Sequence, residues 1–119
     1  MKYIEKNTIF NEVVHCINNN NYSVLAVTTS TDKQIQLSTD IGHEIIAFMA
    51  KHEIDKANVD IGDGIDGVEY EFSNGSTIKV ARLYELTTFD KYDSIIVDKS
   101  ISLDMLSNKM DLLRLVEKV

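Results

Sequence analysis

A single apolar segment, Ser23-Val24-Leu25-Ala26-Val27-Thr28, limits the folds that are open to this chain. The segment is continuous rather than alternating, and it is rich in β-branched residues. This pattern is typical of a strand that is covered on both faces, and such strands occur mainly in parallel sheets. We therefore expect an α/β protein in which Ser23–Thr28 is a central, parallel strand.

Two amphipathic helices flank this strand in the sequence. The first is predicted over residues 8–18, where apolar residues recur at helical spacing: Ile9, Phe10, Val13, Val14 and Ile17. The asparagines at 18–21 follow as a loop. The second helix begins after Thr31 or Asp32, either of which can cap it, and ends between His52 and Asp55. Its apolar stripe consists of Leu37, Ile41, Ile45 and Phe48.

The alternating segment Val68–Phe72 and the Asn74-Gly75 turn signal predict a β-hairpin. A two-residue turn would place Ile78 beside Glu71. A three-residue loop with Gly75 in the left-handed conformation instead unites the apolar faces of the two strands, so this register is expected. The predicted pairs are Phe72 with Ser76, Tyr70 with Ile78 and Val68 with Val80.

The last part of the chain contains one more strand and one more helix. Ser94–Val97 is apolar and ends in Asp98. A helix is predicted over Ser102–Val119, capped by Ser100 or Ser102, with Leu103, Leu106, Met110 and Leu113 on one stripe. Further apolar residues widen this stripe beyond one sheet face. They predict an interface for a second copy of the chain or for another protein, formed by Met105, Leu112, Leu115 and Val116.

Length and charge narrow the classes of function. The chain has 119 residues, which suits one domain over 1–119, and a net charge of −7 without a cluster of basic residues. Direct nucleic-acid binding is therefore not expected, because phosphate contacts need clustered Lys and Arg. The single cysteine, Cys16, predicts a reducing cytoplasm, and no segment is apolar enough for a membrane span.

The order of these elements and three motifs resemble the ATPase core of tailed-phage large terminases and related helicase-type P-loop proteins. Lys6-Asn7-Thr8 stands where that family has Gly-Lys-Thr at its first helix. Phe72–Ile78 resembles the family's hairpin, and Tyr92–Asp98 resembles the strand that ends in a magnesium-binding aspartate. The resemblance covers nearly the whole chain. It implies the first half of that core: a three-layer P-loop or Rossmann-like sandwich with a short parallel sheet, an antiparallel hairpin and flanking helices.

The resemblance also implies a nucleotide and magnesium site formed by Lys6, Thr8 and Asp98, and the departures from the family imply that this site is a relic. Only Met1 to Glu5 precede Lys6, which is too few for the glycine-rich phosphate loop. Lys99 stands where many such ATPases have a glutamate that orients the attacking water, and a lysine cannot accept a proton as a carboxylate does.

We therefore expect a phage-encoded, non-catalytic domain that binds or regulates a protein partner and uses no cofactor. The alternative is a nucleotide-binding enzyme that is completed by oligomerisation or by another subunit.

Three other patterns receive structural interpretations. The acidic, glycine-rich segment 60–67 is expected to be a flexible connection, because its glycines occupy positions where a calcium loop needs side-chain oxygens. His15, His43 and His52 share no metal-ligand spacing. Cys16 has no basic neighbour in sequence that would lower its pKa, so an inert thiol is expected.

Overall fold

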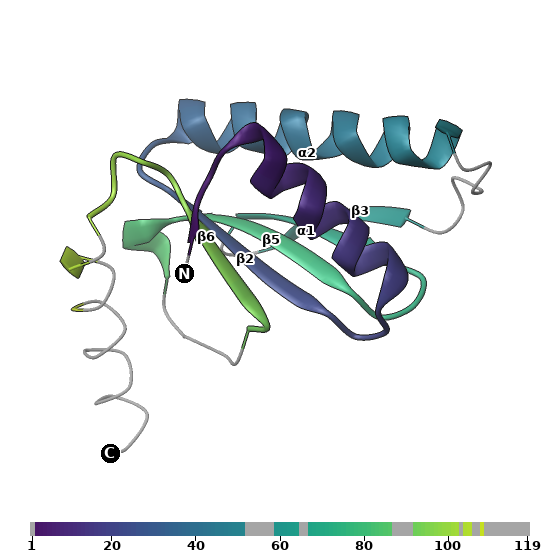
Figure 1. The fold of residues 1–119 in the computed structure, drawn as a ribbon. Coiled ribbons are helices and arrows are strands. Elements are labelled where there is room, and N and C mark those ends of the chain that lie inside the picture. Colours follow the sequence, from purple (N-terminus) through teal and green to yellow (C-terminus); the bar gives the residue numbers. More distant parts are fainter. Residues whose placement is uncertain are drawn as a thin grey trace, which may run out of the picture.

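The computed structural model describes residues 2–51, 59–64, 67–86 and 92–102, together with residues 104, 105 and 108. These residues form an α/β fold with a six-stranded sheet in the order β1-β6-β2-β5-β4-β3. Strands β1, β6, β2, β5 and β3 all run in the same direction, and β4, between β5 and β3, is antiparallel to both of its neighbours. The predicted short parallel core with an antiparallel hairpin is confirmed (Figure 1).

The bounds of the elements agree closely with the sequence pattern where the prediction named them. The helices are α1, Lys6–Asn18, and α2, Thr31–Lys51. The strands are β1 (Lys2–Tyr3), β2 (Ser23–Thr28), β3 (Val59–Gly64), β4 (Gly67–Phe72), β5 (Thr77–Arg82) and β6 (Ser94–Val97), and a 3₁₀ helix η2 spans Leu83–Glu85. The cap of α2 differs from the expectation. Ser30 Oγ accepts a hydrogen bond from the Lys33 backbone N–H, whereas Thr31 and Asp32 already lie in the first turn.

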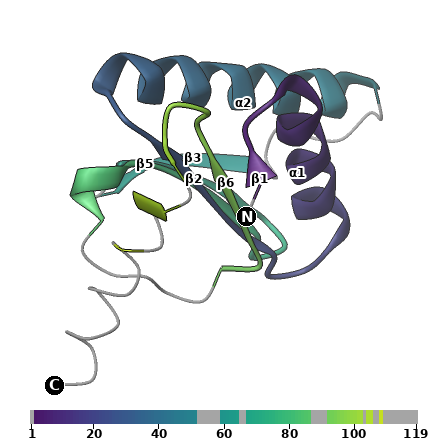
Figure 2. The same cartoon turned by 60° about the vertical axis from the view of Figure 1, so that its left-hand side comes forward.

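Both described helices lie on the same face of the sheet, because their crossovers run in the same direction. The chain passes from β1 through α1 to β2 and then through α2 to β3, each time toward the β3 edge. Since parallel crossovers are right-handed, two that run the same way place their helices on one face. The connection from β5 to β6 runs the opposite way, and η2 lies on the other side of the sheet (Figure 2).

Each face of the sheet has its own apolar core. The face under the helices packs residues of α1 and α2 against the inward side chains of β2, β4, β5 and β6; among them are Val13, Val24, Ile41, Tyr70, Ile78 and Ile96. The opposite face is covered by η2 and by the turn after β6, and its core consists of Leu25, Val27, Ala81, Leu86, Val97 and Ile101. Strand β2 is buried from Val24 to Thr28, as the continuous apolar run predicts.

One residue of the apolar stripe predicted for the first helix, Phe10, does not pack into the core. Phe10 is 46% exposed, because α1 turns Glu12 inward instead, and the Glu12 side chain is buried.

The hairpin has the predicted register and the predicted loop. Tyr70 pairs with Ile78 and Val68 with Val80. Gly75 has a φ of +86°, which is the left-handed conformation that the three-residue loop requires. The loop also fixes the end of α1, because the Asn74 side-chain amide donates hydrogen bonds to the backbone oxygens of Cys16, Ile17 and Asn19. The Asn-Gly-Ser sequence of the hairpin therefore caps α1 at its carboxyl end.

The expectation of a flexible connection over 60–67 is wrong for its first half. Val59–Gly64 forms β3, which pairs with β4 from Val59↔Phe72 to Gly64↔Gly67. Pairing with the regular strand β4 supplies hydrogen bonds that this acidic, glycine-rich segment would not secure by its own propensity.

The predicted C-terminal helix is described only at its start. Residues 104 and 105 are helical, and the Met105 backbone N–H donates to Ser102 Oγ over 3.1 Å, as expected for a cap. Met105 is 52% exposed. Leu112, Leu115 and Val116 lie outside the described residues, and so does most of the predicted third layer. Among the helices that the structure describes, none is long and apolar enough to cross a membrane.

Candidate functional site

A crevice opens where the carboxyl ends of β1, β6 and β2 meet. These strands are parallel, so their ends lie at one edge of the sheet. The chain leaves β2 toward α2 on one face, whereas it leaves β6 toward Ile101, which packs on the other face. Adjacent strands whose connections leave to opposite faces create the crevice in which open α/β sheets bind ligands.

Asp98 lies at this edge, directly after β6, at the position that the sequence predicts. Its carboxylate accepts hydrogen bonds from the Ser100 backbone N–H at 2.8 Å and from Ser100 Oγ at 2.6 Å. A third hydrogen bond comes from Lys33 Nζ at 3.1 Å. Burial disfavours the charged carboxylate, but these hydrogen bonds and the Lys33 charge outweigh it and lower the pKa of Asp98. All three donors bind the same carboxylate oxygen, Oδ1.

Lys33 is the residue of this site that the sequence interpretation missed. It lies in the first turn of α2, and its ammonium also donates to Ser100 Oγ over 3.2 Å. Ser100 Oγ lies 3.2 Å from Thr29 Oγ1, so the network joins the end of β2, the start of α2 and the turn after β6. One feature of the sequence could have pointed to Lys33. It follows the end of β2 by five residues, and β2 is parallel to β6, the strand that leads to Asp98.

In the described part of the chain, no hydrogen bond or ion pair joins Lys6 or Thr8 to Asp98. Thr8 Oγ1 instead donates to the Tyr3 carbonyl over 3.1 Å, which ties the first turn of α1 to β1. Lys6 is the exposed first residue of α1 and contributes to a different cavity from Asp98. Of the predicted trio, Lys6 lines the larger cavity described below, Asp98 lines the smaller one, and Thr8 lines neither.

The connection from β1 to α1 consists of only two residues, Ile4 and Glu5. Glu5 occupies the N-cap position without a side-chain hydrogen bond to the helix, and its Oε1 lies 3.1 Å from Lys99 Nζ. A helix N-terminus attracts negative charge, and here the chain supplies that charge itself. Lys99 is thus an ion-pair partner of Glu5.

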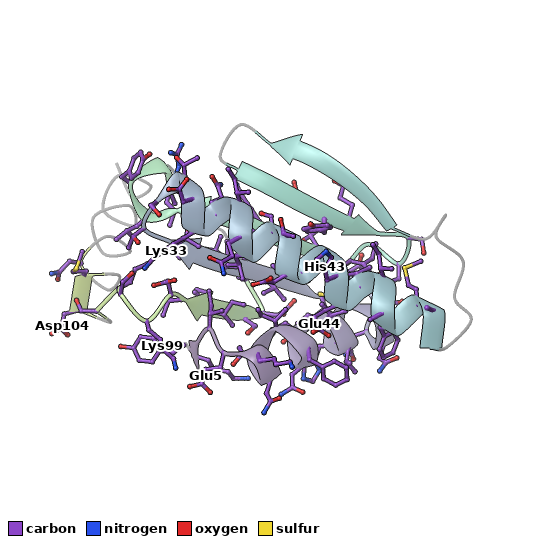
Figure 3. All side chains as sticks on the ribbon, turned by 90° about the horizontal axis from the view of Figure 1, so that it is seen from above. Glu5, Lys33, His43, Glu44, Lys99 and Asp104 are labelled. Carbon is purple, nitrogen blue, oxygen red and sulfur yellow. The ribbon has the colours of Figure 1, made fainter. Side chains whose placement is uncertain are left out.

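Two adjoining cavities lie between the start of α1 and the side of α2. The larger has a volume of about 460 Å³ and is lined by Ile4, Glu5, Lys6, Ile9, Asp40, His43 and Glu44. The smaller, about 200 Å³, shares three of these residues with it and reaches Asp98; it is lined by Ile4, Ile9, Lys33, Gln36, Leu37, Asp40 and Asp98. Figure 3 shows Glu44 on the side of α2 that faces α1, and Glu5 next to Lys99 at the start of α1.

The charged side chains that line the larger cavity differ in whether they have an ion-pair partner within the chain. Glu5 has Lys99 as a partner. Asp40, Glu44 and Lys6 form no ion pair or side-chain hydrogen bond with the described residues. Beneath them lie Ile9 and Ile4, of which Ile9 is buried. The cavity therefore combines an apolar floor with charged groups that remain available to a ligand.

No family model, curated protein or solved structure matches this chain. A fold of this class supports many unrelated functions. The function of the chain therefore has to be inferred from the chemistry of its own residues.

Proposed function

We propose that the chain is a non-catalytic α/β domain that binds or regulates a protein partner. In this proposal it has the three-layer, P-loop-like architecture of a phage terminase or helicase relative, with a degenerate nucleotide site. It acts in the cytoplasm, which the single, buried cysteine supports. The following observations support a binding role over an enzymatic one.

The observation that carries the proposal is the internal pairing of the groups that would serve a nucleotide. One oxygen of Asp98, Oδ1, accepts the hydrogen bonds from Lys33 and Ser100, and the Lys33 ammonium at 3.1 Å repels a magnesium ion at this carboxylate. Glu5 places a negative charge at the N-terminus of α1, where a phosphate would otherwise bind. A phosphate-binding loop has six residues before its lysine, and only two connect β1 to Lys6.

Titration calorimetry with magnesium ATP tests this proposal. We expect no saturable heat of binding up to millimolar nucleotide, because Glu5 repels the phosphates and Asp98 is already paired. A matched variant, Glu5→Gln with Asp98→Asn, measures whether these carboxylates are the cause. Micromolar binding by the natural chain that is abolished by Lys6→Ala would overturn the non-enzymatic proposal.

One observation favours the alternative of a nucleotide-binding protein completed by another subunit. Lys6 lies in the first turn of α1, lines the larger cavity and has no carboxylate partner among the described residues. A lysine in this place could contact a phosphate whose remaining ligands come from a second chain. The alternative requires that nucleotide binding appear only in the presence of that subunit, and that it weaken on Lys6→Ala.

The partner in the proposal is either another protein or a second copy of the chain, bound through the C-terminal residues Met105, Leu112, Leu115 and Val116. The exposure of Met105 supports this surface. Sedimentation velocity of the natural chain and of Leu112→Asp with Leu115→Asp tests it. A natural chain that stays monomeric at high micromolar concentration would contradict self-association and leave another protein as the partner.

A further inference from the structure

We propose that the larger cavity, between the start of α1 and the side of α2, binds a basic side chain of a protein partner. The side chain is an arginine or a lysine presented by a peptide segment. This inference rests on the proposed function, in which the chain binds a protein partner, and it names the side chain of that partner that enters the larger cavity.

The shape of the cavity matches a side chain with an apolar stem and a charged end. Its floor is formed by Ile4 and Ile9, which can cover the methylene groups of a long side chain. Its volume of about 460 Å³ lies within the range of about 300–1,000 Å³ that is usual for ligand pockets. A phosphate or a metal ion would make no use of the apolar floor.

The charge of the lining selects a cation. The lining contains three carboxylates, those of Glu5, Asp40 and Glu44, of which Glu5 is paired with Lys99, together with the ammonium of Lys6 and the side chain of His43. Asp40 and Glu44 are one helical turn apart on α2 and have no ion-pair partner among the described residues. A guanidinium can donate to two carboxylates at once, so this pair is suited to an arginine.

Among the residues that line the larger cavity, Lys6 is the basic one, and its ammonium repels a cationic ligand. A substitution of Lys6 therefore distinguishes binding of an anion in this cavity from binding of a cation. If the cavity receives an anion such as a nucleotide phosphate, removal of the Lys6 ammonium weakens binding. If the cavity receives a cation, the same removal strengthens binding, because a like charge is taken away. The sign of one substitution decides between them.

The experiment is an NMR titration of the ¹⁵N-labelled chain with the peptide acetyl-Ala-Arg-Ala-amide. We expect shift changes that concentrate on Lys6, Asp40, His43 and Glu44, with millimolar affinity that falls as salt is raised. The same peptide with citrulline in place of arginine keeps the shape but lacks the charge. It should bind at least about tenfold more weakly, since the charge-assisted hydrogen bonds are lost.

Three variants test the assignment to this cavity. Asp40→Asn with Glu44→Gln should weaken binding about tenfold, because two exposed ion pairs are removed. The matched control, Glu71→Gln with Asp104→Asn, changes the net charge equally at exposed residues outside the cavity and should stay within about twofold. Lys6→Ala should strengthen binding about two- to threefold, the effect of one like charge across a solvent-filled gap.

All of these positions are exposed or half-buried, and the dispersion of each variant's NMR spectrum reports whether it is folded. Weaker binding by Lys6→Ala, equal effects of the two double variants, or shift changes spread over the surface would each overturn the inference. If neither arginine peptide nor magnesium ATP binds, the inference fails and the proposed function stands. If magnesium ATP binds, the proposed function fails.

Discussion

Replacement of Asp98 by asparagine should destabilise the fold by about 1 kcal/mol at pH 7. An amide keeps an oxygen that can accept the Ser100 backbone N–H, but it removes the charge. The ion pair with Lys33 joins side chains that are 43% and 25% exposed, so it contributes about 0.5 kcal/mol. The loss of charge assistance in the hydrogen bonds from Ser100 adds about as much. Asp98→Ala removes every accepted bond and should cost about 2 kcal/mol.

Urea unfolding followed by circular dichroism measures these differences, and pH gives the decisive control. The pKa of Asp98 is lowered on folding, so its ionisation stabilises the native state at every pH above the usual aspartate value of about 4. This contribution is lost as the pH falls through the lowered pKa of the folded state. The cost of Asp98→Asn should therefore be complete at pH 7 and shrink below pH 4.

Two results would refute this reasoning about Asp98. A cost that grows as the pH falls below 4 would mean that the carboxylate is not held in its charged form. A cost above about 3 kcal/mol at pH 7 would mean that a buried polar network, and not a half-exposed pair, has been broken. A double-mutant cycle with Lys33→Met isolates the ion pair and should give a coupling of about 0.5 kcal/mol.

Three further predictions follow from single residues. Gly75→Ala should cost about 1–2 kcal/mol in urea unfolding, because φ is +86° and a Cβ would lie 2.1 Å from Asn21 Oδ1; an unchanged midpoint would contradict this. Glu12→Gln should lower the unfolding free energy at pH 7 by about 1 kcal/mol, because the buried Glu12 Oε1 lies 3.9 Å from Lys2 Nζ and accepts a hydrogen bond from Ser94 Oγ over 3.0 Å, and the amide would bury an N–H group where Oε2 has no partner in the described part of the chain; a gain of stability would show that burying the charge costs more than these contacts return. Burial, with Glu12 and Asp93 nearby, raises the pKa of Cys16 to about 12. Its reaction with a thiol reagent at pH 8 should be at least about a hundredfold slower in the native state than in urea, and equal rates would refute the assignment.

The sequence predicted the parts of the fold that local pattern controls. The run Val24–Thr28 is apolar on both faces, and the structure buries both. The three-residue loop is the one that brings Tyr70 and Ile78 to the same face of the hairpin, and this requirement fixes the register. The structure shows this pair. In both cases burial of one set of side chains allows only one arrangement.

The sequence did not predict the parts that depend on partners distant in the chain. Val59–Gly64 has two glycines and two aspartates in six residues, a composition that favours turns, and it forms a strand through its pairing with β4. Strand β1, with two residues, is too short to show any periodicity. Lys33 was not recognised because its contact with Asp98 spans 65 residues of sequence.

The same topology explains why the crevice can change its function while the fold persists. The core residues lie on β2, β4, β5 and β6, on the inward faces of the helices, and in the segments after η2 and β6. The charged residues of the crevice instead lie in short connections or on the exposed side of α2: Glu5 between β1 and α1, Asp98 after β6, and Asp40 and Glu44 on the helix. Substitutions at these positions remove charge without opening a cavity in the core, so their cost should stay near 1 kcal/mol rather than the 2–5 kcal/mol typical of core truncations. Binding measurements on the crevice variants therefore report on the ligand chemistry and not on loss of the fold.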